Sequence, residues 1–168
     1  GKVFLPGNGP LDVSGKTLEW ARQHILKMVA ETFVGVHADL RILRLRSFRV
    51  YVTGYVKNPG GVQASSASRA SEALAEAEIQ DVGSRRNVIV RHRDGTAAPV
   101  DLGLFESLGR QDLNPTLVDG DVLEVPRAME WLHVTGAVGG QGKYEFSPRD
   151  SLTTLIRLSG GLLPSAIA

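Results

Sequence analysis

The residues of this chain that could do chemistry are gathered between positions 44 and 58, where three arginines are followed by two tyrosines and an asparagine. The candidate ligand-binding residues are Arg44, Arg46, Arg49, Tyr51, Tyr55 and Asn58. A two-residue spacing places Arg44 and Arg46 on one face of a strand. Arginine binds carboxylates through paired hydrogen bonds, and tyrosine offers a flat apolar ring with a hydroxyl. The set predicts a surface for an acidic sugar polymer; the alternatives are a solvated strand face or a subunit contact.

Catalytic and metal-binding patterns are missing from the sequence. The four histidines, His24, His37, His92 and His133, share no metal-ligand spacing. The glycines of residues 136–142 match neither the dinucleotide fingerprint nor the P-loop, and the serines of residues 65–71 form no nucleophile elbow. Asp119-Gly120-Asp121 reads as a turn between strands. We therefore expect no enzyme, no metal and no cofactor.

The composition describes a core-forming chain without a dominant charge. Its 168 residues are 42% apolar, and 19 basic against 18 acidic residues give a net charge of +1. Such a balance gives no overall attraction to nucleic acid or to an anionic membrane, so no nucleic-acid partner is expected. No apolar run approaches the ~20 residues of a membrane-spanning helix. The absence of cysteine excludes disulfides and thiolate sites.

An internal repeat organises the chain. The run VYVTGYVKNPG at residues 50–60 is echoed by HVTGAVGGQG at residues 133–142, with five identical residues at a constant shift of 82 positions. The apolar positions of a following helix recur at the same shift. The repeating unit is therefore strand, glycine turn and helix, and the second copy is expected to be incomplete.

Local patterns predict the elements around this repeat. We expect strands at 2–5 and 11–13, a helix capped by Thr17, and a strand at 36–46 with a bulge near Ile42 and Leu43. Strict alternation over residues 48–56 predicts a half-buried strand.

The repeat units contain further predicted elements. A helix at about 70–77 has Ser68 as its cap, and Asp94-Gly95 predicts a tight hairpin between strands at 87–93 and 96–102. A strand at 122–126 closes the first unit. In the second unit a strand at 131–138 precedes a helix whose expected cap is Ser147.

These motifs carry a family resemblance. The run V-x-V-x-G-x-V-x-N-P-G at residues 50–60, together with N-P-x-L-x-D-G-D-V-L-x-V-P at residues 114–126, resembles the soluble-ligand-binding β-grasp (SLBB) domain. G-K-V-F-L-P at residues 1–6 and V-S-G-K-T-L at residues 13–18 look like the later part of a polysaccharide-export domain. This order is similar to that of bacterial outer-membrane polysaccharide export proteins.

The resemblance implies an α+β fold with a repeated, ubiquitin-like β-grasp domain. The expected domains are the C-terminal part of an export α/β domain (1–47), a first SLBB domain (48–127) and the start of a second, incomplete one (131–168). We expect the chain to be a fragment of a longer protein.

The resemblance also implies a function. The expected role is a non-enzymatic part of a conduit that exports capsular or extracellular polysaccharide from the periplasm through the outer membrane, with a lipid anchor on the full-length protein. Its expected partners are further copies in a ring, the polysaccharide and an inner-membrane polysaccharide co-polymerase. The alternative is a soluble β-grasp receptor for a small ligand or sugar.

Overall fold

The structure is a computed structural model that describes residues 1–5 and 7–167, and it contains two compact units, Gly1–Arg44 and Leu45–Ala168. No helix in the described residues is long and apolar enough to cross a membrane.

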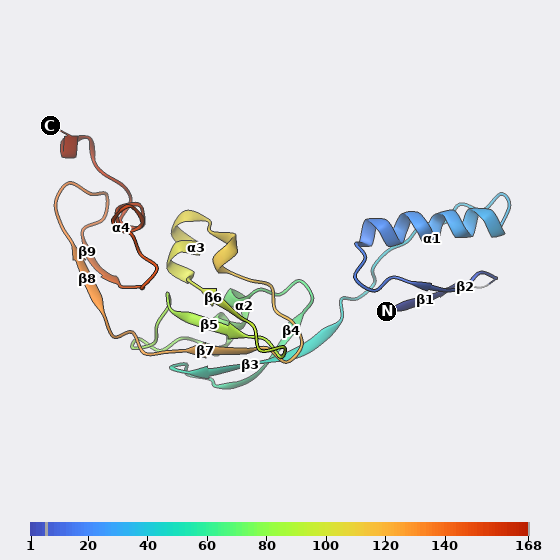
Figure 1. Ribbon diagram of the computed structural model, residues 1–168, viewed down its shortest axis with the longest axis horizontal. Helices are drawn as coiled ribbons and strands as arrows, with labels where there is room; N and C mark the ends of the chain where they lie inside the picture. Colours follow the sequence, from blue (N-terminus) through green and yellow to red (C-terminus); the bar gives the residue numbers. More distant parts are fainter. Residues whose placement is uncertain (6, 168) are drawn as a thin grey trace. The chain divides into compact units, whose positions relative to one another are not determined.

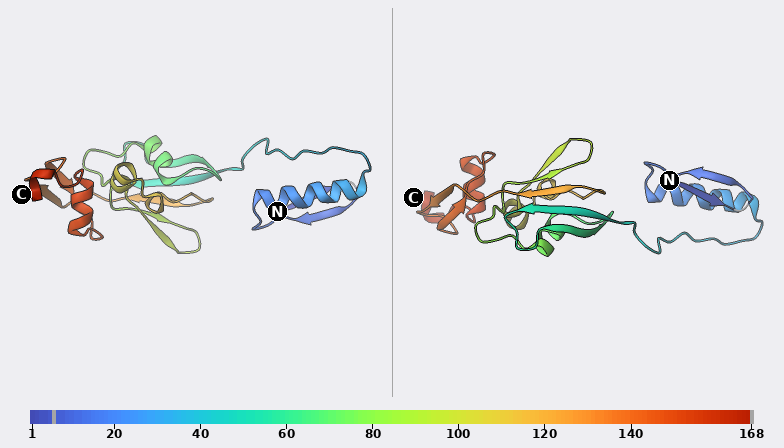
Figure 2. Two further views of the ribbon diagram at one scale, coloured as in Figure 1. Left: turned by 90° about the horizontal axis from the view of Figure 1, so that it is seen from above. Right: turned by 90° about the horizontal axis from the view of Figure 1, so that it is seen from below.

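The first unit is a hairpin with one long helix beside it. Its elements are β1 (Lys2–Leu5), β2 (Gly9–Asp12) and α1 (Leu18–Thr32). The Thr17 hydroxyl accepts a hydrogen bond from the Trp20 backbone N–H (3.1 Å), which confirms the predicted cap. The Asn8 amide donates to the Met28 carbonyl (2.8 Å) and so ties the hairpin turn to the helix. Figure 2 shows the helix lying along the hairpin in both views.

The strand predicted over residues 36–46 is wrong, because residues 36–46 have no regular secondary structure. Leu43 is 92% exposed and Ile42 53% exposed. A strand needs a partner strand for its backbone groups, and none pairs with this segment. The apolar residues that suggested a bulged strand are therefore not buried by a sheet.

The second unit contains most of the regular structure. Its strands are β3 (Ser47–Gly54), β4 (Gly60–Ser65), β5 (Val88–Arg91), β6 (Ala97–Val100), β7 (Val122–Val125), β8 (Trp131–Val134) and β9 (Gly142–Glu145). Its α-helices are α2 (Ala70–Ala77), α3 (Leu102–Leu108) and α4 (Leu152–Leu158), with 3₁₀ turns at Gln111–Leu113 and Pro164–Ile167. The predicted hairpin around Asp94-Gly95 is confirmed as β5 and β6, whereas α3 was not predicted.

Five strands form one mixed sheet in the order β4-β3-β7-β5-β6 (Figure 1). The first and last of these strands along the chain, β3 and β7, are parallel neighbours in the sheet, and the other pairs are antiparallel. Helix α2 contributes Leu74 and three alanines to the core on one face. The α+β class is confirmed, whereas a repeated β-grasp domain stays a prediction.

Strand β3 separates the core from the exposed face of the sheet. Val50 and Val52 are fully buried, while Arg49, Tyr51 and Thr53 alternate with them and are exposed. The predicted half-buried strand is therefore confirmed, because side chains alternate across a strand.

Two predicted helix caps are wrong. Ser68 does not cap α2; the Asn114 side chain instead accepts a hydrogen bond from the Ser71 backbone N–H (2.9 Å) and is fully buried. Helix α4 is capped by Ser151, because residues 147–150 form a separate turn in which the Asp150 carboxylate accepts from the Ser147 N–H (3.0 Å). A cap supplied from 43 residues away leaves no local sequence pattern.

The repeat seen in the sequence is also present in three dimensions. In the β3–β4 turn, the Asn58 backbone N–H donates to the Ala77 carbonyl at the end of α2 (3.0 Å). In the β8–β9 turn, the Gly140 backbone N–H donates in the same way to the Ser159 carbonyl at the end of α4 (2.6 Å). Both pairs differ by the same shift of 82 positions.

The glycine that ends the first strand of each copy has different surroundings in the two copies. Gly54 has φ +90° and Gly136 has φ +97°, a conformation that other residues adopt only with strain. A Cβ on Gly54 would lie 2.1 Å from the Val125 carbonyl oxygen of β7, whereas one on Gly136 would meet nothing within 4 Å. The first glycine therefore also allows β7 to approach β3.

This contrast predicts unequal effects of two matched substitutions. Gly136→Ala should lower the free energy of unfolding by about 1–2 kcal/mol, the cost of the left-handed conformation alone. Gly54→Ala should lower it by at least ~2 kcal/mol more, because β7 must also move. Urea unfolding followed by circular dichroism measures both. Equal losses would show that the contact with Val125 does not limit this position.

Candidate functional site

The structure places the predicted ligand-binding residues in several different environments. Arg49 and Tyr51 lie together on the exposed face of β3. Arg46 precedes the strand and forms an ion pair with Asp119 (3.3 Å). Arg44 belongs to the other compact unit, so it is not placed relative to the rest.

The last two predicted residues serve the turn after β3. Tyr55 is 39% exposed, and its backbone N–H donates to the Val125 carbonyl (2.9 Å). Asn58 holds the end of α2, and its side-chain amide reaches toward the Glu76 carbonyl at 3.5 Å. Of the six predicted residues, the strand register brings Arg49 and Tyr51 together on one face.

That exposed face extends across three strands and is called the open face here. Tyr51 lies opposite Val122 of β7, and Val122 lies opposite Arg91 of β5. In the next row Thr53 is followed by Glu124 and then Ile89. Arg91 and Glu124 form an ion pair across the rows (2.8 Å). The open face is therefore mixed in character, not a basic stripe.

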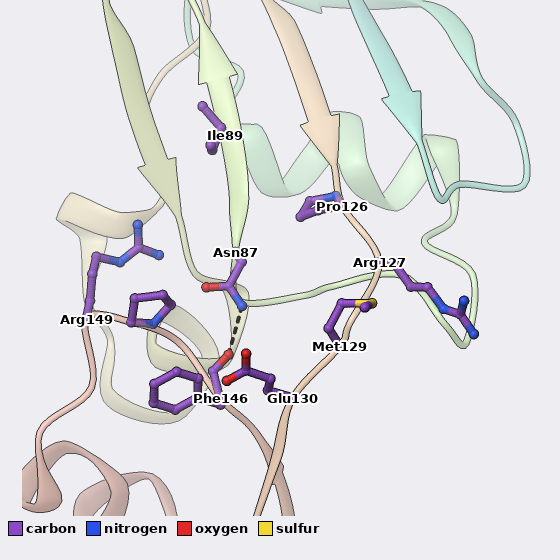
Figure 3. Close-up of a pocket in the computed structure, with 9 residues that line it drawn as sticks. Asn87, Ile89, Pro126, Arg127, Met129, Glu130, Phe146 and Arg149 are labelled. Carbon is purple, nitrogen blue, oxygen red and sulfur yellow. Dashed lines mark hydrogen bonds between the residues drawn. The ribbon is translucent and has the colours of Figure 1, made fainter.

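A pocket lies at one end of the open face, where the chain passes from the five-stranded sheet to the β8–β9 hairpin (Figure 3). We call it the junction pocket. Its volume is about 390 Å³. It is lined by Asn87, Ile89, Pro126, Arg127, Met129, Glu130, Phe146, Pro148 and Arg149. Apolar walls with a few polar groups are typical of small-ligand sites, and this volume falls in their usual range.

Arg86, which is 4% exposed, fixes the hairpin beside the sheet. Its Nε and Nη2 donate to the two carboxylate oxygens of Asp101 (3.2 and 3.0 Å). Its Nη2 and Nη1 donate to the two oxygens of Asp150 (2.6 and 2.8 Å). The remaining N–H donates to the Glu145 carbonyl (2.6 Å). All five guanidinium N–H groups are therefore satisfied.

The ionisation of Arg86 follows from these contacts. Burial alone would lower its pKa, but the hydrogen bonds that it donates to Asp150 and Asp101 outweigh burial and raise the pKa above its ordinary value. Arg86 thus stays charged, and each carboxylate is paired. Asp101 also accepts from the Leu104 N–H (2.9 Å) and so caps α3. One buried ion cluster connects the sheet, α3 and the turn after β9.

A second set of contacts shapes the pocket wall. The Glu145 carboxylate accepts from the Ser84 hydroxyl, from the Arg85 N–H (3.0 Å) and from the Asn87 side-chain amide (3.0 Å). The Asn87 amide also donates to the Phe146 carbonyl (2.9 Å), drawn dashed in Figure 3. On the same wall, Arg149 donates to the Arg86 carbonyl (2.9 Å).

Sequence reasoning missed this region, although the repeat held a sign of it. Glu145 and Asp150 stand where the first copy has Gln63 and Ser68 at the shift of 82. The second copy thus has carboxylates where the first copy has neutral residues. This difference indicates that the second copy makes a contact that the first copy lacks. Their partner, Arg86, lies in an irregular segment and could not be identified from its neighbours.

A second hollow, the repeat groove, opens in the β8–β9–α4 region and has a volume of about 440 Å³. Its lining includes the apolar residues Leu132, Val134, Val138, Leu152, Leu155 and Ile156. Each occupies the position, 82 residues on, of a buried residue in the first copy. In the first copy the core is closed by β5, β6 and β7, and no counterparts of these strands occur among residues 131–167.

Metal ligands do not cluster in the described residues, where no three histidine, aspartate or glutamate side chains could hold an ion together. Asp121, in the turn Asp119-Gly120-Asp121, is fully buried. One oxygen contacts His92 Nδ1 (2.8 Å) and the other accepts from the Val118 N–H (2.8 Å). Its carboxylate thus braces the turn before β7.

Comparison with known proteins points to one group. The chain is 29% identical to the polysialic acid transport protein KpsD of Escherichia coli over 151 residues, which cover 87% of the chain and 26% of that protein. It is 29% identical to the EPS I polysaccharide export outer membrane protein EpsA of Ralstonia solanacearum over 141 residues, 82% of the chain and 37% of that protein. The chain is thus similar over most of its length to proteins named for polysaccharide transport or export.

A shorter match agrees with these two. The EpsA protein of Ralstonia nicotianae is 38% identical over 60 residues, 36% of the chain and 16% of that protein. No family model matches the chain. The chain spans about a quarter of the length of KpsD and somewhat more than a third of that of the Ralstonia solanacearum protein.

The ion cluster predicts a clear difference between a buried and an exposed arginine. Arg86→Met should lower the free energy of unfolding by about 3–5 kcal/mol, because it leaves two buried carboxylates without a positively charged partner. It should also speed proteolysis within residues 126–131, where the hairpin joins the sheet. Arg110→Met, which breaks an exposed pair with Asp112, should leave both nearly unchanged. Urea unfolding and limited trypsin digestion measure these effects. Similar behaviour of the two variants would contradict a central role for Arg86.

Proposed function

We propose that this chain is part of a conduit that exports capsular or extracellular polysaccharide, acting in the periplasm and at the outer membrane. The similarity to KpsD over 151 residues carries the proposal, because it runs through most of the chain and is not confined to one motif. The Ralstonia relatives, whose names state polysaccharide export and the outer membrane, support the same role.

The proposal assigns a non-enzymatic role. A conduit needs a rigid scaffold and surfaces that let a hydrated polymer pass. The relatives are named as transport and export proteins. The α+β fold of the second unit, stabilised by buried ion pairs, is consistent with such a rigid scaffold.

We assign the parts of the chain as follows. Residues 1–47 are the end of a polysaccharide-export domain, residues 48–127 an SLBB β-grasp domain, and residues 131–168 the opening part of a second one. The strand order of the five-stranded sheet, with its first and last strands parallel in the middle, supports the second assignment. The repeat groove supports the third, since it is lined by the counterparts of a complete core.

The proposed assembly is a ring of identical subunits joined head to tail, since a heterologous contact closes into a ring when its rotation allows. An inner-membrane polysaccharide co-polymerase would pass the polymer to this ring. The six candidate residues from Arg44 to Asn58 stay proposed polymer contacts, with Arg49 and Tyr51 best placed on the open face.

A soluble receptor for a small ligand or sugar is the second candidate, and the junction pocket is the observation that favours it. The two differ in assembly. A conduit subunit should form a closed oligomer, whereas a receptor should stay monomeric with one ligand bound per chain.

The export role predicts a loss of surface polysaccharide. Deleting the gene that encodes this chain should strongly reduce polysaccharide at the cell surface, measured by immunoblot of intact cells, while polymer accumulates inside. Reintroducing the gene should restore export. Unchanged surface polymer in the deletion strain would refute the proposed role.

The proposed ring predicts a definite mass in solution. Light scattering across a concentration series should give a whole multiple of the monomer mass that does not grow further with concentration. A second series with an acidic oligosaccharide tests the receptor alternative. A monomer at every concentration that binds one oligosaccharide would favour the receptor.

A further inference from the structure

We infer that the junction pocket is a binding site for an acidic sugar unit, in which Arg149 holds the carboxylate and Asn87 accepts a hydrogen bond from a hydroxyl. The inference rests on the proposed function, since the ligand would be a unit of the exported polymer.

The first observation is that Asn87 has a fixed orientation. Both of its N–H groups are used, one on the Glu145 carboxylate (3.0 Å) and one on the Phe146 carbonyl (2.9 Å). The Phe146 carbonyl is an acceptor only, so turning the amide around would set two oxygens against each other. The Asn87 oxygen itself has no hydrogen-bond partner among the described residues.

Asn87 lines the pocket, and Figure 3 shows its oxygen pointing to the side on which Arg149 lies. This oxygen is not among the fully buried side-chain atoms that lack a partner. Because its amide is held from behind, this oxygen is a preorganised acceptor for a ligand hydroxyl.

The second observation concerns Arg149. Its guanidinium donates one hydrogen bond to the Arg86 carbonyl (2.9 Å), which holds it at the wall. A guanidinium has five N–H groups, so four remain without a partner in the described part of the chain. Paired N–H groups of this kind match the two oxygens of a carboxylate. The wall thus presents a fork of donors beside a fixed acceptor.

The third observation is the apolar lining. Phe146, Ile89 and the rings of Pro126 and Pro148 line the pocket. A sugar ring has C–H groups on its faces that suit such a surface, while its hydroxyls and carboxylate need the polar groups. A volume of about 390 Å³ accommodates one such unit with the start of its neighbours. The pocket therefore fits an acidic sugar within a chain, not a bare anion.

The pocket also has an exit for a polymer. Asn87 and Ile89 continue the row of outward residues of β5 that includes Arg91 on the open face. A chain held in the junction pocket would extend over Glu124 and Thr53 toward Tyr51. This path connects the pocket with the two candidate residues that the structure brings together.

Arg110 gives a matched control outside the pocket. It is not part of the pocket lining, and its guanidinium pairs with the exposed Asp112 carboxylate (2.6 Å). It has the same charge as Arg149. A site based on geometry requires Arg149, whereas binding driven by overall charge would be weakened equally by loss of either arginine.

The test is a titration of the chain with tri-galacturonic acid, followed by calorimetry and by NMR of backbone and side-chain amides. Maltotriose, which lacks carboxylates, is the neutral control. The acidic trimer should bind more tightly than maltotriose and should shift the Asn87 side-chain amide signals. Arg149→Gln should weaken binding by about tenfold or more, the loss expected for a charge-assisted hydrogen bond. Arg110→Gln should change it by less than about twofold.

Several outcomes would overturn the inference. These are no binding of tri-galacturonic acid, equal binding of maltotriose, equal effects of the two arginine variants, or amide shifts confined to the repeat groove. If Arg149→Gln lowers the unfolding temperature, the decision falls to Arg149→Lys, which keeps the charge without the fork and should still weaken binding. If the pocket does not bind tri-galacturonic acid but deletion of the gene still stops export, the site is refuted and the proposed function stands.

Discussion

The arrangement of the second unit depends on the buried guanidinium of Arg86. A charge out of contact with water is tolerated only when its hydrogen bonds and counter-ions replace the lost solvation. Here all five N–H groups find oxygen, and the two carboxylates that face it come from segments far apart in the sequence. Lysine could not substitute, since it lacks the planar fork. The cluster therefore specifies one position for the hairpin beside the sheet.

The junction pocket is a by-product of that position. Its walls come from the start of β5, the segment after β7 and the turn after β9, which the ion cluster and the hydrogen bonds of Glu145 hold together. The site is supported by polar contacts beneath it, on Asn87 and Arg149, and not by the hydrophobic core. The sheet is therefore stabilised mainly by aliphatic packing around α2, whereas the walls of the pocket are held together by charged and polar contacts.

Elements that depend on local periodicity were predictable from the sequence. The alternation around Val50 and Val52, the Thr17 cap and the Asp94-Gly95 hairpin are all recorded within a few neighbouring residues. The cap of α2 was not, because it comes from Asn114, and the strand expected at 36–46 failed for lack of a partner strand. The ligand surface was predicted within one stretch of the sequence, residues 44–58, whereas the pocket joins residues from three separate segments. Contacts between distant segments leave no regular spacing in the sequence from which they could be predicted.

The separation of these contacts along the chain has a consequence for how the molecule reaches its final form. The bonds from Arg86 to Glu145 and Asp150 join residues 59 and 64 positions apart, whereas β8 and β9 pair within one short hairpin. Long loops close late because ordering them costs entropy before any contact forms. The contacts that hold the pocket therefore form late, and a sugar bound there would shift the population of the chain toward the folded form by mass action. The fraction of folded molecules would then depend on the concentration of that ligand.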